Sequence, residues 1–419
     1  MMSHYITKIH IDQVRHLQNL DIELFPDKRS HLILTGKNGS GKTSLLNSIK
    51  TNLASISNGE RNKALAYYPQ RIAELKKRCE QENRPKDQIK KDENQLTWLE
   101  KKLNTATAGI SLYFNTEDGL VTDFQEGAFI TACFPANRLT QISAPHGVED
   151  VKLQTHYNVE QQPVMELIKY LVHLKTQQAY AKNENDHDVE ERIANWFSTF
   201  EKAIQTLVED DSISLTYDYK NYNFLIHQSG RNPFGFNQLS DGYSAAIYIL
   251  SDLLMRMDQG WLQKGTVLDK SAEGVVLIDE VETHLHLALQ KSILPFLTEM
   301  FPNLQFIVTT HSPFVVNSLE DAVIYDLETK TMVRHGLSNV SYEGIVEGYF
   351  QTDTLSAVLR QKFERYKSLI LKPALTDDDY DEIMSLEQYL DEIPDYLSIG
   401  IAEEYGRLKL EFQTREDMQ

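Results

Sequence analysis

The sequence has few cysteines and no long apolar run. Among its 419 residues only Cys79 and Cys133 are cysteines, which excludes a disulfide framework and a cysteine-rich zinc site. No stretch approaches the ~20 apolar residues that a membrane-spanning helix needs. Residues 1–18 mix charged with apolar side chains, so we expect no secretory signal. Together these absences favour a cytoplasmic protein with no membrane partner.

The sequence also has fewer basic than acidic side chains. The chain carries 42 Lys and Arg against 61 Asp and Glu, a net charge of −19. This balance argues against a protein coated in nucleic acid, although a local basic patch is compatible with it. The length allows two or three domains, and the 41% apolar and 25% charged fractions are ordinary for a globular protein.

Hydrophobic patterns divide the chain into regions. Short apolar runs at 31–35, 275–278 and 306–308 are typical of buried parallel strands. Residues 61–104 repeat apolar side chains at heptad-like spacing on both sides of a turn at 83–85, which predicts an antiparallel helical hairpin. We therefore expect an α/β domain built from 1–60, 105–230 (with a helical insertion) and 231–339, an inserted hairpin at 61–104, and a helical extension at 340–419.

Two of these regions have unusual charge. The hairpin carries 12 basic and 7 acidic residues, and the extension carries 8 basic and 18 acidic residues. The hairpin is either a solvated helical pair or a contact for nucleic acid or a protein partner. The acidic extension is either a solvated tail or a docking site for a basic partner.

A phosphate-binding loop follows the first buried strand. Residues 36–43, GKNGSGKT, match G-x-x-x-x-G-K-[ST] fully, with a strand pattern before and a helix pattern after. Glycines let the backbone wrap a phosphate chain, Lys42 supplies a cation to it, and the Thr43 hydroxyl can bind Mg²⁺. The predicted nucleotide-binding residues are Gly36, Asn38, Gly39, Ser40, Gly41, Lys42, Thr43 and Ser44.

Two later strands end in side chains suited to phosphoryl transfer. Asp279 and Glu280 follow the run 275–278, where Asp279 can hold Mg²⁺ and Glu280 can act as the base for an attacking water. His311 follows the run 306–308, where it can hydrogen-bond a γ-phosphate.

A third motif opens a predicted helix over 242–264. In Leu239-Ser-Asp-Gly-Tyr243, Ser240 and the N–H of Gly242 can present hydrogen-bond donors to an anion at the helix N-terminus.

This order of Walker A, signature, Walker B glutamate and His-switch resembles the ABC-type ATPases of the SMC/RecF/OLD group. The resemblance implies an ABC-ATPase head with a mixed sheet and flanking helices, bound ATP and Mg²⁺, and ATP hydrolysis. It also implies head-to-head dimers, in which Ser240 and Gly242 complete the γ-phosphate site of the other protomer. The signature departs from LSGGQ at Asp241 and Tyr243, which sets it apart from transporter motors.

The resemblance leaves other positions less defined. For the Q-loop glutamine, a nucleotide and metal contact, we favour Gln141 over Gln125. Arg15 lies where related ATPases carry an N-terminal Asn-Phe-Arg, so it is either a nucleotide contact or a residue with no part in binding. Residues 281–286 occupy the D-loop position, where a pair of histidines (284 and 286) suggests either packing or a metal site, and we favour packing.

Three segments narrow the resemblance further. Residues 135–138 (PANR), 278–286 and 301–313 are similar to ATPases of bacterial anti-phage systems, in particular the PtuA family of the Septu system. That likeness implies a regulatory ATPase, a higher homo-oligomer, a separate HNH-type nuclease subunit of the PtuB kind, and contact with nucleic acid through the complex. We find no nuclease motif in the chain itself. The alternative is a RecF/SMC-like repair ATPase that acts directly on DNA.

Overall fold

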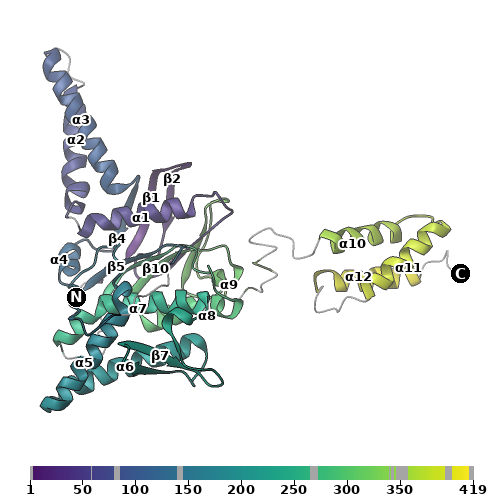
Figure 1. Cartoon of the computed structure of the whole chain (residues 1–419). Helices are drawn as coiled ribbons and strands as arrows, with labels where there is room; N and C mark the ends of the chain where they lie inside the picture. The colour runs from purple at the N-terminus through teal and green to yellow at the C-terminus, as the bar shows by residue number, and fades with distance from the viewer. Residues whose placement is uncertain are drawn as a thin grey trace. The chain divides into compact units, whose positions relative to one another are not determined.

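The computed structural model describes residues 3–57, 59–79, 85–138, 145–264, 272–338, 340, 344–345, 357–391 and 399–414. The chain divides into two compact units, residues 1–340 and 341–419. The first unit has the fold of an ABC-type ATPase head, with a mixed sheet, flanking helices and an inserted helical hairpin (Figure 1), and the second is helical. The expected fold class is thus confirmed.

Six strands form the central sheet in the order β12-β11-β3-β10-β9-β5. They are Thr331–Val333, Ala322–Asp326, His31–Thr35, Leu304–Thr309, Glu273–Ile278 and Phe129–Phe134, in the same order. Only the pair β11 and β12 is antiparallel. Residues in β9 and β10 are buried almost throughout, because both faces of a parallel sheet are covered. The carboxyl ends of β3, β9 and β10 therefore meet at one edge.

Two smaller antiparallel sheets complete the head. One has the order β2-β1-β4, formed by Leu17–Glu23, Ile6–Val14 and Ile110–Phe114. The other has the order β6-β7-β8, formed by Ser214–Asp218, Asn223–His227 and Phe234–Gly235. The first of these sheets, the central sheet and helix α1 (Lys42–Ser57) share one hydrophobic core, to which Ile9, Leu34 and Leu45 belong.

Helices cover the sheets. Those of the head, besides α1, are α4 (Leu120–Gln125), η2 (Pro163–Glu166), α5 (Leu167–Glu184), α6 (His187–Val208), η3 (Phe236–Gln238), α7 (Asp241–Lys264), α8 (Leu287–Met300) and α9 (Pro313–Val316). None of the helices in the described part of the chain is both long and apolar enough to cross a membrane.

The inserted hairpin pairs α2 (Tyr68–Cys79) with α3 (Lys86–Thr107), and the short π-helix η1 (Lys63–Tyr67) leads into it (Figure 1). Its core contains Tyr68, Ile72, Leu75 and Leu99, which are spaced so that one stripe of each helix faces the other. The heptad-like pattern in the sequence corresponds to this buried stripe.

The second unit contains α10 (Ala357–Ile370), α11 (Asp377–Asp391) and α12 (Ile399–Gln413). Phe363, Tyr366 and Ile383 lie in a core of its own. Thr376 and Asp379 cap α11 reciprocally: the Asp379 carboxylate accepts from the Thr376 N–H at 2.8 Å, and the Thr376 hydroxyl accepts from the Asp379 N–H at 3.3 Å. The densest acidic run in the sequence thus begins a helix.

Candidate ATP site

The phosphate loop joins β3 to α1. Gly36, Gly39 and Gly41 have φ values of +130°, +86° and +101°, which L side chains rarely adopt. At Gly36 a Cβ atom would also come within 2.9 Å of the Ser40 Oγ. Glycines at these positions therefore let the backbone turn tightly in front of the helix, where its N–H groups can face an anion.

Lys42 is buried inside this loop. Its Nζ donates to the carbonyl oxygens of Gly36 at 2.6 Å and Lys37 at 3.1 Å, and burial lowers the pKa of its ammonium group. Asn38 and Gly39 are exposed at the loop tip, and the buried Ser40 hydroxyl has no hydrogen-bond partner among the described residues. Two carbonyl oxygens of the loop thus hold the Lys42 ammonium group, and phosphate oxygens of a bound nucleotide can take their place.

Asp279 meets the phosphate loop at the carboxyl edge of the sheet. Its Oδ1 accepts from the Thr43 hydroxyl at 3.2 Å and from the Thr309 hydroxyl at 2.6 Å. Thr309 ends β10, which pairs in parallel with β9 and so brings the two strand ends together. The hydroxyl of Thr43 and the carboxylate of Asp279 are hard oxygen donors, which fit Mg²⁺.

Glu280 has an unusual backbone, with φ at +44° in the left-handed region. Its N–H donates to the Thr309 Oγ1 at 2.7 Å. The Arg138 Nη2 donates to the carbonyl oxygens of Asp279 at 2.8 Å and Glu280 at 3.1 Å. Thr309 and Arg138 therefore both hold the backbone of this turn, from which the Glu280 side chain projects.

Arg138 is only 6% exposed, and its Nε and Nη1 atoms have no hydrogen-bond partner in the part of the chain that the structure describes. Burial lowers the pKa of its guanidinium to about 10, against the opposing effect of Glu282, Asp279 and Glu280. The sequence analysis named Arg138 only as part of residues 135–138 and gave it no role, and it did not identify Thr309. Both could have been found from their positions, because Arg138 follows β5 and Thr309 ends β10, and both strands neighbour β9.

His311 lies at the same edge. Its backbone N–H donates to the Glu282 Oε1 at 2.5 Å. Burial, and then the charge of Lys42, lowers the pKa of the imidazole. A pKa below the usual 6.5 leaves the ring neutral at physiological pH, able to donate from one nitrogen and accept at the other.

The signature lies beside the D-loop of the same chain. Ser240 is accessible just before α7, whereas Gly242 packs so closely that a Cβ atom would come within 2.6 Å of the His284 carbonyl oxygen. The His286 Nδ1 accepts from the Leu289 N–H at 3.3 Å, and its Nε2 lies 3.1 Å from the Tyr243 hydroxyl. Both ring nitrogens of His286 thus form hydrogen-bond contacts within the chain.

No group of three or more His, Cys, Asp or Glu side chains in the described part of the chain is arranged to hold a metal ion.

The helix that begins at the signature is anchored to the central sheet. The Arg256 Nε donates to the Asp252 Oδ1 at 2.6 Å, and both side chains are buried. The Arg256 Nη1 also donates to the Thr131 carbonyl oxygen in β5 at 2.9 Å. Arg256 thus connects α7, which begins at the signature, to β5, the strand beside β9.

The remaining candidates differ in their placement. Gln141 lies outside the described residues, and Gln125 is exposed at the end of α4. Arg15 is exposed in the turn between β1 and β2, at φ +53°. The contact of this turn with the phosphate loop comes from the next residue, since the His16 Nε2 lies 3.1 Å from the Ser40 carbonyl oxygen.

Comparison with known proteins agrees with this geometry. The family model described as "AAA domain, putative AbiEii toxin, Type IV TA system" matches residues 159–317. The chain is 26% identical over 413 residues to the Septu protein PtuA of Bacillus mycoides (strain KBAB4), a match that covers 94% of this chain and 51% of the relative. It is also 26% identical over 242 residues to the "Retron Ec83 probable ATPase" of Escherichia coli, covering 54% of this chain and 42% of the relative.

The chain thus spans about half the length of the curated relatives it matches. Among solved structures, an SMC head bound to the C-terminal winged-helix domain of ScpA has a TM-score of 0.40 and 13% identity, covering 80% of this chain and 100% of that one. The head is identified by its own sheet order and motifs. The chain thus has the fold and the motifs of an ABC-type ATPase head, and it is similar to a PtuA protein and a retron ATPase.

Proposed function

We propose that the chain hydrolyses ATP in head-to-head dimers, each site combining the phosphate loop of one copy with the signature of the other. The observation that carries the proposal is the hydrogen-bonded cluster of Thr43, Asp279, Thr309 and Glu280 beside Lys42. Ser240 is exposed just before α7, which suits a signature that acts on a second copy.

Each residue of the cluster then has a chemical role. Lys42 exchanges its two carbonyl partners for phosphate oxygens. The Glu280 carboxylate accepts a proton from the water that attacks the γ-phosphorus, while the bond from that phosphorus to the ADP oxygen breaks. His311, neutral at physiological pH, donates a hydrogen bond to the γ-phosphate. Thr43 and Asp279 would hold Mg²⁺, which neutralises charge on the phosphates.

Arg138 acts in this proposal as a positioning residue for Glu280. We expect Arg138→Gln to reduce kcat at least ~10-fold and to leave KM for ATP unchanged, because the Asp279–Glu280 turn relaxes while the phosphate loop stays intact. In a Glu280→Gln background the same substitution should have no further effect on hydrolysis. Arg138→Lys keeps the charge but not the planar guanidinium, and it tests whether charge alone maintains kcat. A raised KM with normal kcat would assign Arg138 to ATP binding instead.

The biological role that we propose is regulation of a nuclease subunit in an anti-phage defence complex. The names of the two relatives, a Septu protein and a retron ATPase, support this role. The acidic second unit also exposes Met384 and Leu410, each 63% accessible, which suits docking of a basic partner with an apolar contact. HNH-type nucleases of the PtuB kind are the expected partner class.

Purification of the tagged chain from its native operon tests this role. We expect a second, nuclease-like polypeptide to co-purify in fixed ratio, and identification by mass spectrometry with the native mass would give the assembly size. Deletion of residues 341–419 should release the partner and leave ATP hydrolysis intact. A chain that purifies alone and binds DNA in a salt-sensitive manner would contradict the proposal.

That last outcome describes the second candidate function, a repair ATPase that acts directly on DNA. The observation in its favour is the hairpin, whose residues 61–104 carry 12 basic and 7 acidic side chains. Charge reversal on the α2–α3 face, at Lys76 or Lys101, would then weaken DNA binding by the isolated chain.

A further inference from the structure

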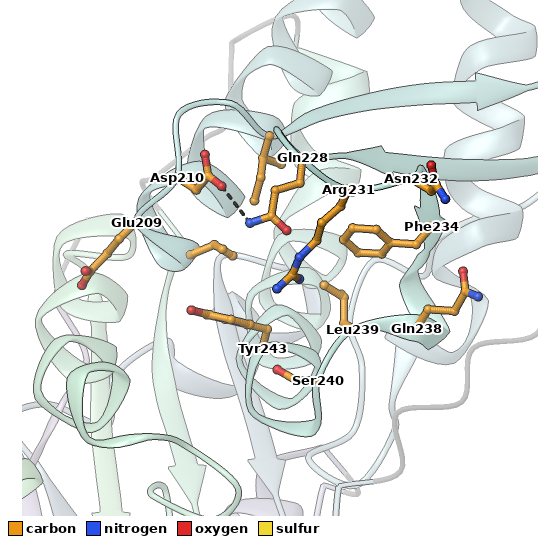
Figure 2. Close-up of a pocket in the computed structure, with 12 residues that line it drawn as sticks. Glu209, Asp210, Gln228, Arg231, Asn232, Phe234, Gln238, Leu239, Ser240 and Tyr243 are labelled. Carbon is orange, nitrogen blue, oxygen red and sulfur yellow. Dashed lines mark hydrogen bonds between the residues drawn. The ribbon is translucent and has the colours of Figure 1, made fainter.

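A pocket of about 570 Å³ opens beside the signature. Three segments line it: the turn after α6, the connection from β7 to β8, and the signature itself with the turn before it (Figure 2). Ser240 and Tyr243 lie on one side of this pocket, and Arg231 enters from the other. The pocket therefore continues the surface that presents the signature serine.

The segment that carries Arg231 is braced against the turn after α6. The Gln228 Nε2 donates to the Asp210 Oδ2 at 2.7 Å (Figure 2), and the Ser229 N–H donates to the Ser212 Oγ at 3.0 Å. The Arg231 N–H closes a turn on the Gln228 carbonyl oxygen at 3.2 Å. A braced backbone holds the start of the arginine side chain in place, which favours a defined target for its head group.

The guanidinium group of Arg231 points into the pocket (Figure 2) and forms no ion pair within the described part of the chain. Hydrogen bonds from Ser212 and Gln228 lower the pKa of Asp210, and the charge of Arg231 adds to this effect. The Asp210 carboxylate accepts from the Gln228 side chain and from the Ser212 N–H at 2.8 Å, and it forms no ion pair with Arg231 within the described part of the chain. An exposed arginine in a polar pocket presents a planar fork of donors that matches phosphate oxygens. Arg231 is thus available for an anion that its own chain does not supply.

We propose that this pocket receives the triphosphate end of ATP held by the phosphate loop of a second copy, and that Arg231 donates hydrogen bonds to its phosphate oxygens. The inference rests on the proposed head-to-head dimer, which brings that nucleotide to Ser240. It adds a charged group in trans to the neutral donors of the signature. Such a group stabilises the charge that develops as the γ-phosphate leaves.

Mixed dimers separate action in trans from action within one chain. Two differently tagged variants, Glu280→Gln and Arg231→Ala, are co-expressed and purified through both tags, so each dimer contains one of each. One site then combines an intact Glu280 with the intact Arg231 of the other copy. We expect Arg231→Ala homodimers to hydrolyse ATP about 100-fold more slowly. The mixed dimers should recover about half of the wild-type rate, because one of two sites is complete.

The reverse pairing is the matched control. When the double variant Glu280→Gln/Arg231→Ala is paired with the wild-type chain, both sites lack one group, so we expect no recovery. Lys220→Ala removes an exposed cation from the β6–β7 turn, outside the pocket, and should leave the rate unchanged. Arg231→Lys, which keeps the charge, should retain part of the rate. If Arg231→Ala does not fold, as judged by its Tm, Arg231→Gln takes its place in each pairing.

Ser240→Ala distinguishes failure of this inference from failure of the proposed dimer. If Ser240→Ala is rescued by pairing with Glu280→Gln but Arg231→Ala hydrolyses normally, the composite site stands and the role of Arg231 is overturned. The role of Arg231 is also overturned if Ser240→Ala is rescued but the mixed dimer of Arg231→Ala with Glu280→Gln is not. If neither variant is rescued in mixed dimers, the composite site itself is wrong.

Discussion

Glu280→Gln is expected to bind ATP normally and to hydrolyse it at least ~100-fold more slowly than the wild-type chain. Glutamine has the shape of glutamate but cannot accept the proton of the attacking water. The backbone contacts of Glu280 with Thr309 and Arg138 do not involve the carboxylate, so the turn should keep its conformation. Single-turnover hydrolysis measures the chemical step, and nucleotide titration measures binding.

A matched control for this substitution is Glu320→Gln, since Glu320 is exposed and lies outside the site. It removes the same charge and should hydrolyse ATP at the wild-type rate. Normal hydrolysis by Glu280→Gln would mean that another group activates the water, and the assignment of the base would be wrong.

Lys42→Ala is expected to raise the Kd for ATP roughly 100-fold, equivalent to about 3 kcal/mol of lost interaction. The Lys42 ammonium is buried among the carbonyls of the phosphate loop, as its contacts with Gly36 and Lys37 show. Because burial already disfavours this charge, as its lowered pKa indicates, removal should not lower the Tm of the protein without nucleotide. Fluorescence titration with an ATP analogue gives the Kd.

Lys37→Ala provides the comparison within the same loop. The Lys37 ammonium is exposed and pairs with Glu328 at 2.9 Å on the surface, where such pairs contribute little. Its loss should change the Kd for ATP by less than about threefold. Equal effects of the two substitutions would indicate that net charge, not the position of Lys42 inside the loop, governs binding.

Much of the site could be predicted from the sequence because its motifs are local. The glycines of residues 36–41 and the lysine and threonine after them specify one turn of backbone, and the apolar runs of β9 and β10 specify strands buried on both faces. Local spacing therefore predicted these strands and placed Asp279, Glu280 and His311 at their ends, and the resemblance carried by the motifs predicted the ABC-type head.

Other residues reach the site only because of the order of strands in the sheet, which the spacing of residues along the chain does not reveal. Thr309 reaches Asp279 because β10 pairs with β9, and Arg138 reaches the same turn because Phe134 pairs with Ile278 across β5 and β9. The contact of His16 with the phosphate loop likewise depends on how the turn between β1 and β2 packs. Arg231 shows the same limit, since only the folded head brings residues 209–213 and 228–234 to the signature.

Native mass spectrometry of Glu280→Gln, with and without ATP and Mg²⁺, tests the composite site most directly. In the head-to-head arrangement, ATP should convert the head to pairs that carry two nucleotides each, whereas ADP should not. Ser240→Arg in the same background should bind ATP in each chain and fail to pair, because a bulky cation replaces the small signature hydroxyl. ATP-loaded chains that never pair, or pairing that does not depend on nucleotide and on Ser240, would contradict a site shared between two copies.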